Sequence, residues 1–172
     1  MLHLYWGDGK GKTTAAMGLA LRALGHGRRV VILQFLKDGS SGEIEMLRRC
    51  GAAVYACPNA KFTWLMTDAE RAEARRTNTR TLQTILQGSF DLLVLDEPVT
   101  GLDPAAADDL YRTLRYLNRT EGMAVVMVTH DIRSALRYAT RILHAGQGQW
   151  FSGSVAEYLA SPYGKRFGGE TA

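Results

Sequence analysis

A glycine-rich loop between an apolar segment and a helical segment restricts the fold of this chain more than any other feature. The apolar segment covers residues 3–6, the loop covers residues 7–14, and the helical pattern continues to residue 24. Glycines let backbone N–H groups point at an anion, and the N-terminus of the following helix adds partial positive charge. The loop therefore predicts a phosphate-binding site in a strand–loop–helix unit.

The predicted ligand of this loop is ATP with Mg2+. Lys12 is expected to reach the terminal phosphate oxygens, and the Thr13 hydroxyl is expected to bind Mg2+. Trp6 stands where the general pattern has a leading glycine, but the strand–loop–helix context outweighs this departure. The alternative is a glycine turn that binds no ligand. Tyr5 and Trp6 are candidates for contact with the adenine base. The predicted nucleotide-binding residues are Gly7, Asp8, Gly9, Lys10, Gly11, Lys12, Thr13 and Thr14.

Short apolar segments alternate with longer stretches of helical spacing along the whole chain. The apolar segments cover residues 3–6, 30–36, 52–56, 92–95, 123–128 and 141–143. Their apolar residues are continuous rather than alternating, which is typical of parallel strands covered by helices on both faces. With 172 residues, the chain suffices for one domain. We predict a three-layer α/β P-loop NTPase fold over residues 1–172, with a mostly parallel central sheet and a short C-terminal hairpin that turns at residues 146–148.

Local signals place the starts of three helices. Thr67 followed by Glu70 fits a capping box, Asp103 precedes Pro104, and Asp131 begins a further helix. Leucines at helical spacing after Pro104 predict one buried helix face. These leucines are Leu110, Leu114 and Leu117.

Acidic and polar residues follow two of the predicted strands. Asp96 and Glu97 end the apolar run 92–95, and His130 follows the run 123–128. Asp96 is expected to hold Mg2+ through a water molecule, and Glu97 to orient or deprotonate an attacking water molecule. His130 is expected to contact the terminal phosphate. The alternatives are a strand-end cap for Asp96, a solvated acid for Glu97 and a histidine without a catalytic role for His130.

Composition and charge bound the partners and the compartment. Hydrophobic residues make up 46% of the chain and charged residues 22%, and no apolar run is long enough for a membrane span. The first residues are typical of a strand and not of a secretory signal, so we expect a cytoplasmic protein. The net charge of +4 comes from scattered basic residues, and no nucleic-acid partner is expected. Cys50 and Cys57 are predicted to be reduced core residues.

From residue 1 to about 97 the chain resembles ATP:corrinoid adenosyltransferases. The matching motifs are residues 7–16, residues 18–27, the Gln-Phe-Leu-Lys motif at 34–37 and the Phe-Thr-Trp motif at 62–64. Proteins of that family move the adenosyl group of ATP to the cobalt of a reduced corrinoid and release triphosphate. Their glycine loop has the same shortened form as here. The resemblance implies that Phe62 and Trp64 contact the corrin ring; the alternative is that they cover a sheet edge.

From about residue 92 onward the chain resembles the ATPase subunits of ABC transporters of the metal-importer type. The motifs are Leu-Asp-Glu-Pro at 95–98, Thr-Gly-Leu-Asp-Pro at 100–104 and Val-Met-Val-Thr-His-Asp at 126–131. The resemblance implies that Glu97 polarises water, His130 senses the γ-phosphate and Asp103 contacts a second subunit. The signature motif of that family is absent from residues 76–87, so no transporter partner is expected.

The two resemblances meet at the shared strand 92–97. The simplest interpretation is an engineered chimera of an adenosyltransferase-like segment, 1–97, and an ABC-like segment, 98–172; the alternative is a natural recombinant or divergent protein. The first functional hypothesis is an Mg-ATP-binding domain with weak or no hydrolysis. The second is an active enzyme, either a slow ATPase that uses Glu97 and His130 or a residual corrinoid adenosyltransferase, with hydrolysis favoured. The third is a folded scaffold whose loop binds nothing.

Overall fold

The computed structural model describes residues 1–35, 37, 39–56, 67–100, 102–146 and 148–165. None of the helices in this described part combines the length and the hydropathy that a membrane-spanning helix requires.

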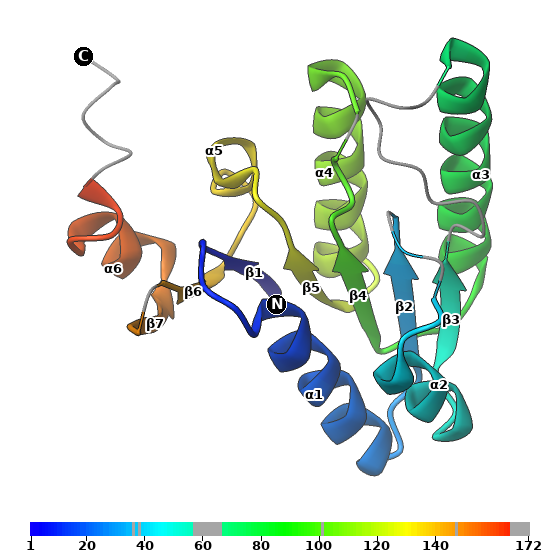
Figure 1. The fold of residues 1–172 in the computed structure, drawn as a ribbon, viewed down its shortest axis with the longest axis horizontal. Coiled ribbons are helices and arrows are strands. Elements are labelled where there is room, and N and C mark those ends of the chain that lie inside the picture. Colours follow the sequence, from blue (N-terminus) through cyan, green and yellow to red (C-terminus); the bar gives the residue numbers. More distant parts are fainter. Residues whose placement is uncertain (36, 38, 57–66, 101, 147, 166–172) are drawn as a thin grey trace.

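A seven-stranded sheet forms the centre of the molecule (Figure 1). Its strand order is β3-β2-β4-β5-β1-β6-β7, and neighbouring strands run parallel except for β6 and β7. The strand β5 lies between β1, which precedes the glycine loop, and β4, which ends at Asp96. The strands are β1 (Leu2–Trp6), β2 (Val30–Gln34), β3 (Ala53–Ala56), β4 (Leu92–Asp96), β5 (Ala124–Val128), β6 (Arg141–Ala145) and β7 (Trp150–Ser154).

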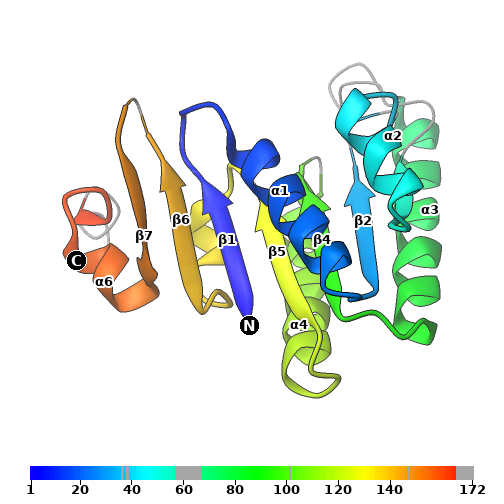
Figure 2. The same cartoon turned by 90° about the horizontal axis from the view of Figure 1, so that it is seen from below.

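Helices cover both faces of the sheet, so the predicted three-layer α/β fold is confirmed (Figures 1 and 2). Helices α1 and α2 lie on one face, and α3, α4 and α5 lie on the other. The antiparallel pair β6 and β7 is the predicted C-terminal hairpin. The helices are α1 (Lys12–Gly25), α2 (Gly42–Arg49), α3 (Asp68–Gln87), α4 (Pro104–Arg119), α5 (Ile132–Ala135) and α6 (Val155–Ala160).

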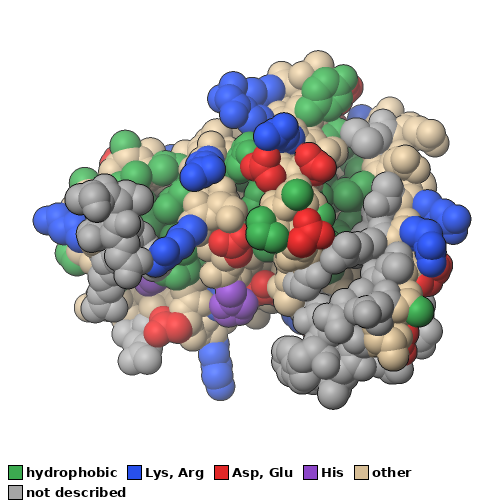
Figure 3. Space-filling model, turned by 90° about the horizontal axis from the view of Figure 1, so that it is seen from above, with side chains coloured by type: hydrophobic (Ala, Val, Ile, Leu, Met, Phe, Trp, Pro, Cys, Tyr) green, Lys and Arg blue, Asp and Glu red, His purple; other side chains and the backbone are tan. Residues whose placement is uncertain are grey.

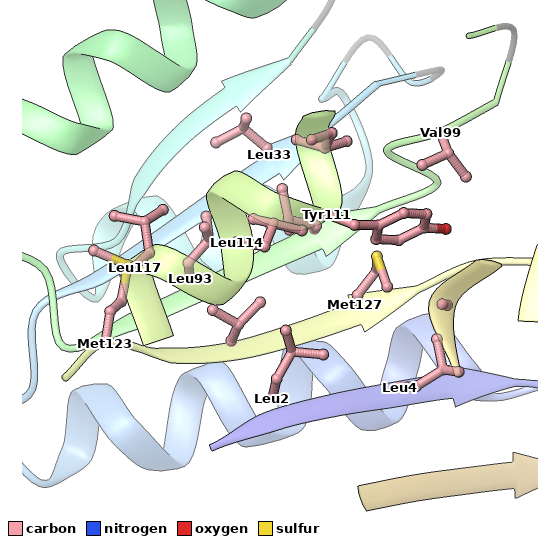
Figure 4. Packing of buried hydrophobic residues seen from close by; sticks show 14 of the residues in the cluster. Leu2, Leu4, Leu33, Leu93, Val99, Tyr111, Leu114, Leu117, Met123 and Met127 are labelled. Carbon is pink, nitrogen blue, oxygen red and sulfur yellow. The ribbon is translucent and has the colours of Figure 1, made fainter. Parts of the chain in front are cut away.

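Two apolar cores separate the three layers, which explains why the central strands are apolar at every position. In β4, Leu93 and Leu95 belong to the core under α4, whereas Leu92 and Val94 belong to the core under α1. Successive side chains of a strand point to opposite faces, so a sheet covered on both faces needs apolar residues throughout. The α4 face carries the predicted leucines, all of them buried against the sheet (Figure 4).

The predicted helix starts are confirmed in atomic detail. Thr67 Oγ1 accepts a hydrogen bond from Glu70 N–H at 3.3 Å, and the Glu70 carboxylate accepts one from Thr67 N–H at 2.8 Å. The Asp103 carboxylate accepts a hydrogen bond from the N–H of Ala106 at 3.0 Å, and Asp131 caps α5. These caps satisfy N–H groups that have no partner within the helix.

Two sequence interpretations need correction, those for Cys50 and Tyr5. Cys50 is exposed at the end of α2 instead of buried in the core; Cys57 lies outside the described residues. Tyr5 is 8% exposed, and the Trp6 ring packs edge-on against His144 and Tyr158. Tyr5 is therefore buried in the core and presents no free face to a nucleobase, whereas Trp6 is partly buried and its contact with the base stays a prediction. The prediction of scattered basic residues needs no correction, because the basic side chains are scattered on the face shown in Figure 3.

Candidate functional site

The glycine loop follows β1 and packs against the end of β6. Gly7 has φ of 118°, and a Cβ on Gly7 would lie 2.2 Å from the carbonyl oxygen of Ala145. The Gly9 N–H donates a hydrogen bond of 2.8 Å to the same oxygen. Glycine is therefore required at position 7 both by backbone conformation and by the close approach of β6. This contact fixes the path of the loop.

The Lys12 ammonium lies over the loop. Its Nζ donates hydrogen bonds to the carbonyl oxygens of Gly7 at 2.6 Å and Gly9 at 2.9 Å. Gly11, with φ of 100°, precedes α1 and provides no side-chain cap. The first N–H groups of α1 lack partners within the helix, as in other helices, and the helix dipole favours an anion at this end. The loop thus joins a lysine charge to a helix N-terminus, the combination that binds phosphate.

Asp96 connects this loop to the end of β4. The carboxylate is buried, with 3% exposure, and its Oδ1 accepts a hydrogen bond from Thr13 Oγ1 at 3.4 Å. Its Oδ2 accepts hydrogen bonds from Lys37 Nζ at 2.6 Å and Gln34 Nε2 at 3.3 Å. The predicted metal residues Thr13 and Asp96 are therefore brought together, although they are 83 positions apart.

The donor set around Asp96 fits Mg2+. A hydroxyl and a carboxylate are the hard oxygen ligands that this cation takes, and Mg2+ sites in nucleotide-binding proteins need few side chains because phosphates and water complete the shell. The described residues accordingly include no cluster of three or more His, Cys, Asp and Glu side chains suited to a metal. Thr13 and Asp96 would hold the ion, which would neutralise phosphate charge.

Glu97 adopts a conformation that is rare for a residue with a side chain. Its φ is 55°, and it is the one described non-glycine residue with positive φ. Its N–H donates a hydrogen bond of 2.8 Å to Val128 O, which holds the backbone between β4 and β5. Such strained positions persist only where the surrounding structure maintains them, and they occur most often at active sites. The conformation turns the peptide out of the strand directly after Asp96.

The Glu97 carboxylate has two side-chain partners. Its Oε1 lies 3.2 Å from Nε2 of His130, and Thr100 Oγ1 donates a hydrogen bond of 3.2 Å to Oε2. The Glu97 side chain is 17% exposed and the His130 side chain 70%. Burial raises the pKa of Glu97, opposed by attraction to His130 and by the Thr100 hydrogen bond. The predicted catalytic pair is thus assembled, with a carboxylate that is more basic than an ordinary one.

The raised pKa predicts a pH-dependent effect of Glu97→Gln on stability. A carboxyl group whose pKa is higher in the folded state favours folding at acid pH, and this contribution is lost as pH rises from the ordinary value of 4.5 through the folded-state pKa. The substitution should therefore raise the thermal unfolding midpoint relative to the unsubstituted protein, and more at pH 8 than at pH 5. Thermal melts at both pH values measure the difference.

Glu157→Gln provides a control of opposite sign. The backbone N–H and the hydroxyl of Ser154 lower the pKa of Glu157, so its contribution to stability appears as pH rises through this lowered pKa. Glu157→Gln should lower the midpoint at pH 8 more than at low pH. If both substitutions shift the midpoint in the same direction, the assigned environment of Glu97 is wrong.

The remaining predicted residues fall into two groups. Asp8 and Lys10 lie on the loop and Thr14 lies in the first turn of α1, all three with exposed side chains. Phe62 and Trp64 lie outside the described residues.

Two residues were missed as site residues. Lys37 belongs to the Gln-Phe-Leu-Lys motif, but nothing in its spacing indicated that it would reach Asp96. Trp150 lies at the start of β7, and a Cβ on Gly11 would lie 3.4 Å from its Cη2 atom. The sequence signals for these two residues were a lysine after a buried strand and an aromatic residue after a glycine turn. Both patterns are too common to identify a site residue.

Solved structures of ABC transporter ATPases share this fold. A metal-chelate type ABC transporter in an inward-facing conformation matches with a TM-score of 0.60 and 18% identity, over 95% of this chain and 76% of that chain. An ATP-binding cassette in its ADP conformation matches with a TM-score of 0.54 and 15% identity, over 98% of this chain and 88% of that chain. The predicted P-loop NTPase fold is confirmed; at these identities the likeness concerns the fold alone.

Sequence relatives reproduce the mixed resemblance predicted from the motifs. The zinc uptake system ATP-binding protein ZurA of Listeria monocytogenes is 38% identical over 68 residues, which cover 40% of this chain and 26% of that protein. The corrinoid adenosyltransferase of Pseudomonas aeruginosa is 35% identical over 133 residues, 75% of this chain and 65% of that protein. The corrinoid adenosyltransferase of Escherichia coli K12 is 35% identical over 100 residues, 56% of this chain and 50% of that protein.

The family assignment rests on the match to a family model, which covers more than half of the chain. The model of the family described as ATP:corrinoid adenosyltransferase BtuR/CobO/CobP matches residues 1–142 and extends beyond residue 97, the predicted end of the adenosyltransferase-like segment. The chain spans 65% and 50% of the lengths of the two adenosyltransferases above. By the extent of this match, the chain belongs to the ATP:corrinoid adenosyltransferase family.

Proposed function

We propose that this chain binds Mg-ATP at residues 7–14, with weak or no hydrolysis. The observation that carries the proposal is the convergence of Lys12, Thr13 and Asp96 at the carboxyl edge of the sheet, with Thr13 Oγ1 3.4 Å from Asp96 Oδ1. Ligands of parallel α/β sheets bind at this edge, and a lysine next to a helix N-terminus matches a triphosphate in charge. The relatives on both sides of the mixed resemblance support ATP as the nucleotide.

Hydrolysis would use Glu97 and His130. The Glu97 carboxylate accepts a proton from water as the water oxygen attacks the terminal phosphorus, and ADP leaves as the bridging P–O bond breaks. His130, 3.2 Å from Glu97, orients the carboxylate from the solvent side. We infer a slow reaction because the His130 side chain is 70% exposed, and water around it weakens the electrostatic stabilisation of the transition state.

Adenosyl transfer to a corrinoid is the second candidate, favoured by family membership. In that reaction the bond between the ribose carbon and the triphosphate breaks, a carbon–cobalt bond forms, and triphosphate leaves. The predicted corrinoid contacts are Phe62 and Trp64. Placement of cobalt near the ribose carbon determines the rate, since a misplacement of about 1 Å costs roughly a hundredfold. We rank transfer below hydrolysis because Glu97 and His130 are in contact at 3.2 Å, whereas the two predicted corrinoid contacts lie outside the described residues.

The chimera interpretation remains our proposal for the mixed resemblance. Strand β4, where the two segments meet, pairs with β2 on one side and β5 on the other. The core under α4 combines Leu4 and Leu33 with Leu114 and Met127, from both sides of the proposed junction. A junction inside a strand that both parent families share would keep this packing continuous, which supports the interpretation.

Thermal unfolding with and without Mg-ATP tests the proposed binding. A ligand at 100 times its Kd that binds only the folded state stabilises by about 2.7 kcal/mol, so Mg-ATP should raise the unfolding midpoint. Lys12→Ala should abolish this rise, because it removes the ammonium that contacts the carbonyl oxygens of Gly7 and Gly9 and is expected to reach the terminal phosphate. Arg22→Ala, which removes an exposed cation from the same helix, should leave the rise unchanged. No rise in the unsubstituted protein would disprove ATP binding.

Product analysis separates the two reactions. Release of inorganic phosphate identifies hydrolysis, and release of triphosphate that depends on reduced corrinoid identifies adenosyl transfer. Binding without either product leaves the chain as a nucleotide-binding domain.

A further inference from the structure

The phosphate loop has an exposed aromatic neighbour from the other end of the chain. Trp150 begins β7, and its Cη2 and Cζ2 atoms would lie 3.4 and 3.7 Å from a Cβ on Gly11. The absence of a side chain on Gly11 gives the indole direct access to the loop backbone. Trp150 is 56% exposed, whereas Tyr5 is buried and Trp6 is partly buried, with its ring against those of His144 and Tyr158. Among the described aromatic side chains beside the loop, Trp150 therefore retains a large accessible surface.

The hairpin that carries Trp150 is tied to the loop. Ala145, the register partner of Trp150 in β6, accepts the hydrogen bond from Gly9 N–H at 2.8 Å. The Gly146 N–H donates to the Gln149 carbonyl at 2.9 Å and closes the turn. Figure 2 shows this turn and the loop after β1 at the same edge of the sheet. The backbone that carries the indole is thus fixed beside the loop before a ligand arrives.

The base of the turn is fixed by a second set of contacts. Tyr163 Oη donates a hydrogen bond of 2.6 Å to the Gln149 side-chain oxygen, and the Tyr163 ring lies 4.7 Å from that of His144 in β6. These contacts restrain the residue that precedes Trp150. Preorganisation of an aromatic side chain lowers the entropy lost on binding.

We propose that Trp150 is the base-stacking residue of the nucleotide site, and that the site takes purine nucleoside triphosphates. The proposal rests on the proposed binding of ATP at residues 7–14. With phosphates in that loop, the nucleoside extends over surface adjacent to it, and the exposed indole is placed at that surface. Stacking on an aromatic side chain uses the face of a base and not its hydrogen-bonding edge. Purines, with two fused rings, should bind more tightly than pyrimidines, with little distinction between adenine and guanine.

The test compares Mg-ATP with Mg-tripolyphosphate, which carries the same phosphate chain without a nucleoside. Isothermal titration calorimetry gives Kd for both ligands with the unsubstituted protein, Trp150→Leu and Trp150→Phe. We expect Trp150→Leu to raise Kd for Mg-ATP about tenfold, which is 1.4 kcal/mol, and to change Kd for tripolyphosphate less than about twofold. Trp150→Phe should recover most of the affinity for Mg-ATP. Circular dichroism confirms that each variant is folded.

Fluorescence provides a second measurement. Stacking of a purine on the indole should quench emission when Mg-ATP is added and not when tripolyphosphate is added. The ATP-dependent quenching should be lost in Trp150→Phe, although Trp6 and Trp64 remain. Mg-GTP should quench like Mg-ATP, and Mg-CTP should bind more weakly than either.

The outcomes distinguish this proposal from the one on which it rests. Binding of Mg-ATP with an unchanged ratio of Kd values in Trp150→Leu would overturn base stacking and leave ATP binding intact. Equal weakening of both ligands would assign Trp150 a role in loop structure and also overturn stacking. If the unsubstituted protein bound neither ligand, both proposals would fall.

Discussion

Gly7→Ala is expected to lower the free energy of unfolding by about 3 kcal/mol and to abolish stabilisation by Mg-ATP. The backbone of Gly7 has φ of 118°, a region that favours glycine. In addition, the new Cβ would lie 2.2 Å from the Ala145 carbonyl oxygen, which belongs to the backbone of β6 and has no flexible end to move. The loop and β6 would have to separate, and the hydrogen bond from Gly9 to Ala145 would be lost with them.

Gly18→Ala is the matched control for this substitution. Gly18 lies inside α1, and a Cβ on it would meet no atom within 4 Å. Alanine is preferred to glycine in a helix interior by about 0.5–1 kcal/mol, so this variant should be more stable than the unsubstituted protein. Urea unfolding of both variants measures the two free energies. A loss below about 0.5 kcal/mol for Gly7→Ala would contradict the close packing of the loop against β6.

The parts of the fold that were predictable from sequence are those set by local or periodic signals. Continuous apolar runs of four to seven residues required a sheet covered on both faces, and the two cores under α1 and α4 meet that requirement. The capping residues Thr67 and Asp103 act on N–H groups three residues ahead, so their effect is visible in the local sequence. The glycine loop is a similarly local device.

The parts that were missed depend on register between distant segments. Gln34 pairs with Asp96 across β2 and β4, and this register brings Lys37, just beyond β2, to the Asp96 carboxylate. Trp150 reaches Gly11 because β6 and β7 form a hairpin beside β1. Neither the offset of a strand pair nor the left-handed conformation of Glu97 is determined by residue type, because both result from packing of the whole sheet. The prediction for Cys50 was wrong for a related reason, because an apolar neighbourhood in sequence did not fix whether the residue that follows α2 would face the core.

Lys37→Met is expected to destabilise the protein by about 1–3 kcal/mol. Lys37 Nζ lies 2.6 Å from Asp96 Oδ2, and the Asp96 side chain is 3% exposed. Removal of the ammonium would leave a buried carboxylate without its nearest cation, and such a loss costs more than the pair itself contributes. The loss falls below the range for fully buried pairs because the Lys37 side chain is 46% exposed. Lys10→Met, which removes an exposed lysine of the loop, should change stability by less than about 0.5 kcal/mol.

Asp96→Asn in the Lys37→Met background distinguishes lost charge compensation from lost packing. If the uncompensated carboxylate causes the instability, the double variant should recover most of the loss, with a coupling energy of about 1–2 kcal/mol between the two positions. Mg2+ without nucleotide should raise the unfolding midpoint of Lys37→Met, since the ion replaces the missing positive charge at Asp96, and should not raise that of the double variant. Midpoints at several Mg2+ concentrations measure this. An equal response of both variants to Mg2+ would show that the ion does not bind at Asp96. The expected difference would mean that Lys37 and Mg2+ compete for the Asp96 carboxylate. In that case, Lys37 has to move away from Asp96 when Mg-ATP binds.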